Sequence, residues 1–168
     1  MVTEWMGRYR ALVAALVQHS NLVNKGITRQ NVVGGGIRLS IQEWQIFEHI
    51  LEHHDETFSM VTMSKRLGIP QSSFARAVKH LCSCGLVDKY QAVNNRKNII
   101  LKPTDYGRQI YQENAGKLLE HVFGCFFEAL EPLSDQALAT VTEAINTLNL
   151  RLDPEPEAPE EVRLVRKE

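Results

Sequence analysis

Apolar residues recur at a spacing of three or four positions in several stretches of the chain, which predicts amphipathic helices. The first stretch covers about residues 3–24 and ends near Gly26, a common type of helix stop. The second begins at Ser40, where the sequence SIQE is a capping box, and continues for about 14 residues. Between them, three consecutive glycines in VVGGGIR leave the backbone too free for a helix, so a loop is expected over residues 25–38.

Two shorter helices follow, and then the period changes. One helix is predicted from about Ser59 to Leu67, and Pro70 opens another that ends at Gly85. The apolar face of the second helix consists of Phe74, Ala77, Val78 and Leu81. The segments LVDKYQAV and KNIILK have strand character, and the turn NNR between them predicts a β-hairpin.

Two longer helices complete the folded part of the chain. Thr104 is expected to cap a helix over residues 104–130, and Ser134 to cap another over residues 135–149. The tail that follows is rich in proline and glutamate and has too few apolar residues to fold, so we predict that it is disordered. The predicted fold class is therefore mainly α (α+β).

Charged residues are distributed unevenly along the chain. The formal net charge is −1, but residues 59–103 contain eight lysines and arginines and one aspartate, which gives this segment +7 and leaves −8 for the remainder. A locally basic segment is typical of a surface that binds an anionic partner, and nucleic acid is the commonest one inside cells. A basic patch that is only solvated is the alternative.

Composition narrows the class of protein further. Of the 168 residues, 43% are hydrophobic and 23% charged, the balance of a soluble globular protein, and no apolar run is long enough to cross a bilayer. The N-terminus lacks a signal-peptide core and the three cysteines suit reduced thiols, so we expect a cytoplasmic protein with no membrane partner. No catalytic set and no phosphate-binding glycine loop is recognisable, so we expect neither an enzyme nor a cofactor.

The order helix, short helix, turn, helix and hairpin is that of a winged helix-turn-helix. In this motif the second helix of the turn enters the DNA major groove and presents its N-terminal polar residues to the bases. The residues expected to read bases are Gln71, Ser72, Ser73 and Arg76. Lys79 and His80 lie further along the helix, where contacts with phosphates are expected.

The hairpin is expected to act as the wing. Its tip carries Asn95, Arg96 and Lys97, which would reach along the duplex toward the minor groove. An arginine has the length and the charge to enter a narrow, electronegative groove, so Arg96 is the main candidate for this contact. A cationic turn that is only solvated is again the alternative.

The same segments resemble the MarR family of transcription regulators. SSFARAVKHLCSCGLVDK resembles the family's recognition helix, NNRKNIILKPTDYG its wing, and LSIQEWQIFEHILEHH with MVTMSKRLGI the two preceding helices. The resemblance spans about residues 5–149. It implies a homodimer, most simply a repressor, that binds a near-palindromic operator in double-stranded DNA and responds to a small aromatic effector.

The resemblance also implies how the chain is divided. A dimerisation helix and loop would occupy residues 1–38, the winged helix-turn-helix residues 39–103, further dimerisation helices residues 104–150 and a disordered acidic tail residues 151–168. The wing departs from the family pattern, because Asn95 stands where an aspartate usually precedes the arginine. Only a neutral hydrogen bond can then hold the wing arginine in place.

Three residues are candidates for the effector site. They are His19, Trp44 and Phe47. A histidine at the surface or at the dimer seam is the simpler interpretation of His19, and the spacing of Trp44 and Phe47 favours a helix core.

Histidines and cysteines suggest two further sites, neither of which the pattern favours. His49 and His53 have the i, i+4 spacing of a metal-binding pair and lie near Glu52, but a solvated helix end is favoured, so no metal site is predicted. Incidental thiols are favoured over a redox sensor for Cys82, Cys84 and Cys125. The alternatives to a DNA-binding regulator of the simple type are a winged-helix dimer that binds another protein and a redox- or metal-responsive regulator.

Overall fold

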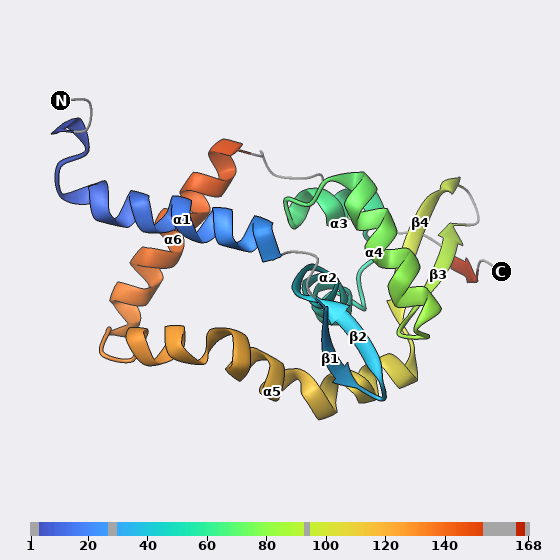
Figure 1. The fold of residues 1–168 in the computed structure, drawn as a ribbon. Helices are drawn as coiled ribbons and strands as arrows, with labels where there is room; N and C mark the ends of the chain where they lie inside the picture. Colours follow the sequence, from blue (N-terminus) through green and yellow to red (C-terminus); the bar gives the residue numbers. More distant parts are fainter. Residues whose placement is uncertain (1–3, 27–29, 93–94, 153–163, 167–168) are drawn as a thin grey trace.

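The computed structural model describes residues 4–26, 30–92, 95–152 and 164–166 of the chain (Figure 1). The predicted fold class, a mainly α winged helix-turn-helix flanked by long N- and C-terminal helices, is confirmed. The elements in chain order are η1 (Glu4–Tyr9), α1 (Arg10–Gly26), β1 (Gln30–Gly34), β2 (Ile37–Ser40), α2 (Ile41–Glu52), α3 (Met60–Arg66), α4 (Gln71–Ser83), β3 (Val87–Ala92), β4 (Asn95–Pro103), α5 (Asp105–Leu130), α6 (Asp135–Leu152) and β5 (Leu164–Arg166).

One hydrophobic core holds the winged helix-turn-helix together. It forms where α2, α3 and α4 pack on one another, on the strands β3 and β4 and on the start of α5. Its largest fully buried side chains include Phe47, Ile50, Phe58, Met63, Phe74, Val78, Leu81 and Leu101. Burial of each such side chain stabilises the fold by about 1.5–3 kcal/mol, so packing against this core holds α4 in a fixed position.

The predicted helix starts are confirmed by their hydrogen bonds. The Ser40 hydroxyl accepts the Glu43 amide at 3.2 Å, and the Glu43 carboxylate accepts the Ser40 amide at 2.7 Å, which completes the capping box. Ser59 and Thr104 accept in the same way at the starts of α3 and α5, at 3.1 and 2.9 Å. Pro70 is the N-cap of α4 rather than its first helical residue.

The expectation of a loop over residues 25–38 is wrong for its second half. β1 and β2 pair as an antiparallel hairpin, and the turn between them is made by Gly34–Gly36 with φ from 56° to 122°. Residues with a side chain rarely adopt such angles, so the glycines permit a turn rather than preventing structure. Val33 and Leu39, on the two strands, are buried in the core and anchor the hairpin.

The prediction of a disordered tail is also wrong in part. Leu164–Arg166 form the strand β5, which pairs antiparallel with β3, so the strand order of the wing sheet is β4–β3–β5. β3 would otherwise present an unpaired edge, and a short strand satisfies its backbone groups. Residues 153–163 and 167–168 of the tail lie outside the described residues.

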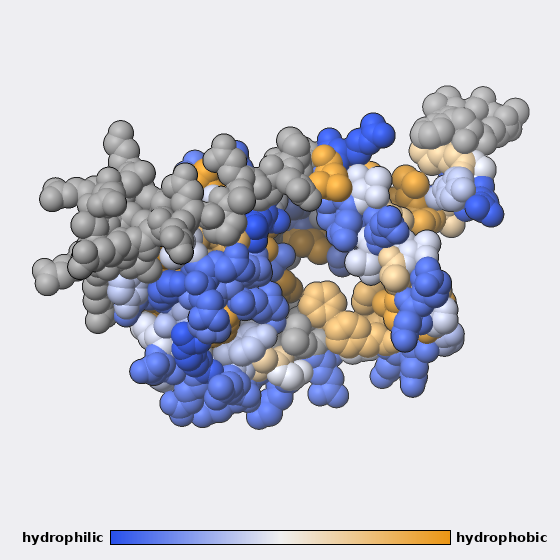
Figure 2. Space-filling view, turned by 180° about the vertical axis from the view of Figure 1, so that it is seen from behind, coloured by the Kyte–Doolittle hydropathy of each residue, from blue (hydrophilic) through white to orange (hydrophobic). Residues whose placement is uncertain are grey.

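The helices α1 and α6 and the second half of α5, together called the helical arm below, stand apart from this core. Figure 1 shows α1 and α6 on the side opposite the wing, and the space-filling view from behind shows hydrophobic side chains around an opening beside the arm (Figure 2). The exposed apolar side chains of the arm include Leu12, Val17, Val23, Phe126, Phe127, Val141, Ile145 and Leu148. Within the described chain, these apolar faces lack a covering element.

Candidate nucleic-acid interface

The helix α4 buries one face and exposes the other. Its buried side chains are Phe74, Ala77, Val78 and Leu81, as predicted. On the outer face, Gln71, Ser72, Arg76 and Lys79 are exposed and Ser73 is half-buried. The Arg76 guanidinium donates a hydrogen bond to the Ser73 hydroxyl at 3.2 Å, which directs the arginine along this face. The structure therefore gathers the predicted base-reading residues on one open surface.

His80, predicted as a phosphate contact, already has a partner within the protein. Its Nδ1 lies 2.7 Å from Oε1 of Glu43, whose other carboxylate oxygen accepts from both the amide and the hydroxyl of Ser40. These contacts connect α4 to the start of α2 across 37 positions of the sequence. In this arrangement His80 supports the orientation of α4.

The strands β3 and β4 form the predicted hairpin. They pair antiparallel from Val87 opposite Pro103 to Ala92 opposite Asn95. Asn95, Arg96 and Lys97 begin β4, so the backbone places them at the tip, while their side chains lie outside what the structure describes. Their contacts with DNA therefore stay a prediction.

Lys102 belongs to the basic segment but has a structural position. Its Nζ donates hydrogen bonds to the backbone carbonyls of His54 and Glu56, between α2 and α3. Burial lowers the pKa of Lys102. Because its ammonium group points into this connection, Lys102 anchors the base of the wing rather than extending the basic surface.

The candidates for an effector site occupy different environments. His19 is exposed on α1, whereas Trp44 and Phe47 are only 4% and 0% exposed. Trp44 stacks on Tyr111 with ring centroids 5.5 Å apart, and Phe47 meets both rings edge-on. The Tyr111 hydroxyl donates to the Glu48 carboxylate at 2.6 Å, and burial together with this contact raises the pKa of Tyr111 well above its usual value. Trp44 and Phe47 thus join α2 to α5 as part of the core.

The three cysteines are free thiols in different surroundings. Cys82 and Cys84 are half-buried near the end of α4, and Cys125 is exposed on α5. Burial raises the pKa of Cys82 and of Cys84, which reduces the fraction present as the reactive thiolate.

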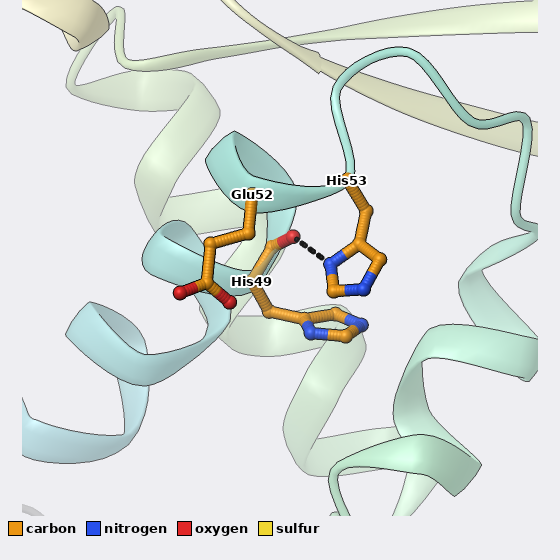
Figure 3. A group of neighbouring side chains, drawn as sticks. All are labelled: His49, Glu52 and His53. Carbon is orange, nitrogen blue, oxygen red and sulfur yellow. Dashed lines mark hydrogen bonds between the residues drawn. The ribbon is translucent and has the colours of Figure 1, made fainter.

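The end of α2 brings together His49, Glu52 and His53 (Figure 3). One candidate ligand atom of each residue lies within 4.8 Å of the other two. Burial, assisted by the charges of His53 and Arg66, lowers the pKa of His49 to about 4, so its imidazole is neutral near pH 7. The sequence pattern favoured a solvated helix end here, whereas both histidines are half-buried. The spacing H-x-x-E-H is the signal that could have identified the group.

The helix order, the exposed face of α4 and the adjoining hairpin together define a winged helix-turn-helix protein. The model of the MarR family matches residues 39–97, a range that includes the helices α2, α3 and α4 and the strand β3. A comparison with curated proteins finds no match. None of the described helices is long and apolar enough to cross a membrane.

Solved structures share this fold over most of the chain. The transcriptional regulator BldR from Sulfolobus solfataricus superposes with a TM-score of 0.62 and 22% identity, over 87% of this chain and 99% of that one. A mutant MarR from E. coli complexed with operator DNA has a TM-score of 0.58 and 15% identity, over 88% and 98% of the two chains. PcaV from Streptomyces coelicolor in complex with its natural ligand has a TM-score of 0.57 and 16% identity, over 85% of this chain and 93% of that one. At these identities the likeness shows the fold.

Proposed function

We propose that the protein is a cytoplasmic, homodimeric, DNA-binding transcription regulator of the MarR type that acts as a repressor. The observation that carries this proposal is the outer face of α4, where Gln71, Ser72, Arg76 and Lys79 are exposed while the opposite face is fixed in the core. Glutamine, serine and arginine side chains pair with base edges in the major groove. The E. coli MarR that shares the fold was solved with operator DNA, which supports the same use of α4 here.

The basic charge of this region suits a polyanionic partner. The segment over residues 59–103 carries +7 in a chain whose net charge is −1, and +6 when Lys102, which anchors the base of the wing, is left out. Phosphate contacts then position the protein, and Arg96 at the wing tip enters the minor groove. Asn95 and Lys97 flank this arginine and contact the backbone of the duplex.

The helical arm is proposed to form the dimer. Phe126 and Phe127 are 55% and 54% exposed, and Leu12 on α1 is 61% exposed, so a single chain leaves large apolar side chains in water. A second copy that covers these faces removes this cost. Residues 1–38 and 104–150 would then serve dimerisation and residues 39–103 DNA binding, with the two copies of α4 about 34 Å apart to read a near-palindromic operator.

We further propose that a small aromatic molecule binds between the arm and the winged helix and releases the operator. PcaV was solved with its natural ligand, which supports a small-molecule effector for a protein of this fold. His19, Trp44 and Phe47 are the proposed contacts. The Trp44 indole Nε1 is buried without a hydrogen-bond partner among the described residues, so it is a donor that a ligand could satisfy.

Selection of bound sequences from random duplexes tests the DNA-binding proposal. The full chain should enrich inverted half-sites with centres about 10 base pairs apart. Light scattering should give the mass of a dimer without DNA, and a reporter gene with the selected site in its promoter should be silenced. A monomer, or failure to enrich any duplex at low salt, would exclude the proposal. If the protein does not bind genomic DNA even when the DNA is in excess, but does bind another protein, the alternative of a protein-binding module is favoured.

A further inference from the structure

Two imidazoles and a carboxylate are grouped on one side of the last turn of α2 (Figure 3). His49, Glu52 and His53 are spaced at i, i+3 and i+4, which places them on one helix face. Their candidate ligand atoms lie within 4.8 Å of one another. A tetrahedral zinc ion, with bonds of about 2.0–2.2 Å, needs ligand atoms about 3.3 Å apart. Metal binding would therefore draw these atoms together by up to about 1.5 Å, through rotation of the side chains.

The protonation of His53 leaves one nitrogen available to a metal. Its Nδ1 lies 3.0 Å from the backbone carbonyl oxygen of His49, which can only accept, so Nδ1 carries the proton and Nε2 has the lone pair. Histidine ligands of metal ions commonly donate their other nitrogen to a carbonyl in this way. Oε1 of Glu56 lies 4.0 Å from His53 Nε2 and is a further oxygen within reach of an ion bound there.

His49 contributes a nitrogen that nothing else in the described chain satisfies. Its Nε2 is buried and has no hydrogen-bond partner among the described residues. The rings of His49 and His53 have centroids 4.1 Å apart, so the two imidazoles can turn toward one ion. Glu52 is exposed, which gives an ion a path from solvent and leaves room for water to complete the coordination.

We propose that His49, Glu52 and His53 form a binding site for one divalent transition-metal ion of the zinc type. Imidazole nitrogens are ligands that zinc and its neighbours accept readily, whereas calcium and magnesium prefer all-oxygen sites. The site directly precedes the backbone carbonyls of His54 and Glu56 that hold Lys102 of β4. A bound ion would therefore stiffen the connection at the base of the wing.

Competition between the full chain and a chromophoric zinc chelator tests this proposal without DNA. The protein must carry no histidine tag, because a tag would itself bind zinc, and its thiols must be blocked. We expect one zinc ion per chain. His53→Gln should weaken binding at least tenfold and Glu52→Gln severalfold, whereas the matched control His54→Gln should change it less than twofold, because the His54 ring bonds to the Leu51 carbonyl outside the group.

A second variant reports on the charge near the site. Arg66 lies close enough to influence His49, so its guanidinium should repel an ion, and Arg66→Gln should tighten zinc binding severalfold. Circular dichroism should show that all variants are folded, and the imidazole NMR signals of His49 and His53 should shift on addition of zinc. Absence of bound zinc, equal affinity of the wild type and His53→Gln, or equal weakening by His54→Gln would each overturn the proposal.

Discussion

The substitution Gly107→Ala, which adds a single carbon atom, tests how closely α5 packs against the winged helix. Gly107 lies in the first turn of α5, where an added Cβ would meet the backbone oxygen of Leu86 at 2.3 Å and two more Leu86 backbone atoms at 3.1 and 3.2 Å. A carbon–oxygen contact needs about 3.3 Å, so α5 would have to move away by about 1 Å. Because the crowded atoms belong to the backbone, no side-chain rotation relieves the overlap.

The expected cost of Gly107→Ala follows from three effects. Overpacking of this kind costs about 1–3 kcal/mol. Movement of α5 also stretches the hydrogen bond from the Thr104 amide to the Leu86 carbonyl, now 3.0 Å, which contributes about 1 kcal/mol. Alanine is better than glycine inside a helix by about 1 kcal/mol, which offsets part of the loss. We therefore expect the free energy of unfolding to fall by about 2 kcal/mol.

Urea unfolding followed by circular dichroism measures this change. All variants are compared at one protein concentration, because the unfolding of the proposed dimer would depend on concentration. Gly116→Ala is the matched control on the same helix, since its Cβ would meet nothing within 4 Å. That control should raise the free energy of unfolding by up to about 1 kcal/mol. If Gly107→Ala proves as stable as the wild type, the close packing of α5 on the connection between α4 and β3 is refuted.

Three further variants test the interface and the core. Arg96→Ala should weaken binding to many duplexes alike and lower the slope of log affinity against log salt concentration by about one, as measured by fluorescence anisotropy; an unchanged slope removes Arg96 from the interface. Arg76→Ala should change the preferred bases, and an unchanged consensus after duplex selection would move the reading face elsewhere. Tyr111→Phe should lower the free energy of unfolding by about 1 kcal/mol, because the Glu48 carboxylate loses its hydrogen-bond donor. The control Tyr106→Phe should change it by less than about 0.5 kcal/mol. Equal changes for the two variants in urea titrations would contradict this expectation.

Local signals predicted the helices of the winged region well. Ser40, Thr104 and Ser134 were recognisable as caps because each side chain accepts a backbone amide only three positions further along the chain. The buried face of α4 was predicted residue by residue, since one helical period determines which side chains share a face. Such features depend on neighbours in the sequence, which a single sequence displays.

The two missed strands depend on other information. The three glycines Gly34–Gly36 are compatible with an irregular loop or with a tight turn. The hairpin is favoured by the burial of Val33 and Leu39 in the core, which the sequence alone does not display. β5 forms against β3, an edge contributed by a distant part of the chain. Composition describes the tail as a whole and could not single out three residues within it.

Contacts between distant residues also separated structural charges from exposed ones. Counting cations treated Lys102 and Arg76 alike, but Lys102 is turned into the connection between α2 and α3 while Arg76 stays on the surface. His80 likewise pairs with Glu43, 37 positions earlier. A periodic pattern carries no information on such pairs, so the internal position of Lys102 and the Glu43 partner of His80 could not be predicted. The contact of His80 with a phosphate stays a prediction.

The most direct test of the proposed function is the stoichiometry and affinity of the complex with a selected duplex. Sedimentation of the wild type should give two chains per duplex. The double variant Gln71→Ala, Arg76→Ala should remain a dimer and lose at least about tenfold in affinity, since each specific base contact contributes about 1–3 kcal/mol. One chain per duplex, or full affinity in the double variant, would contradict the proposal that paired copies of α4 read the DNA.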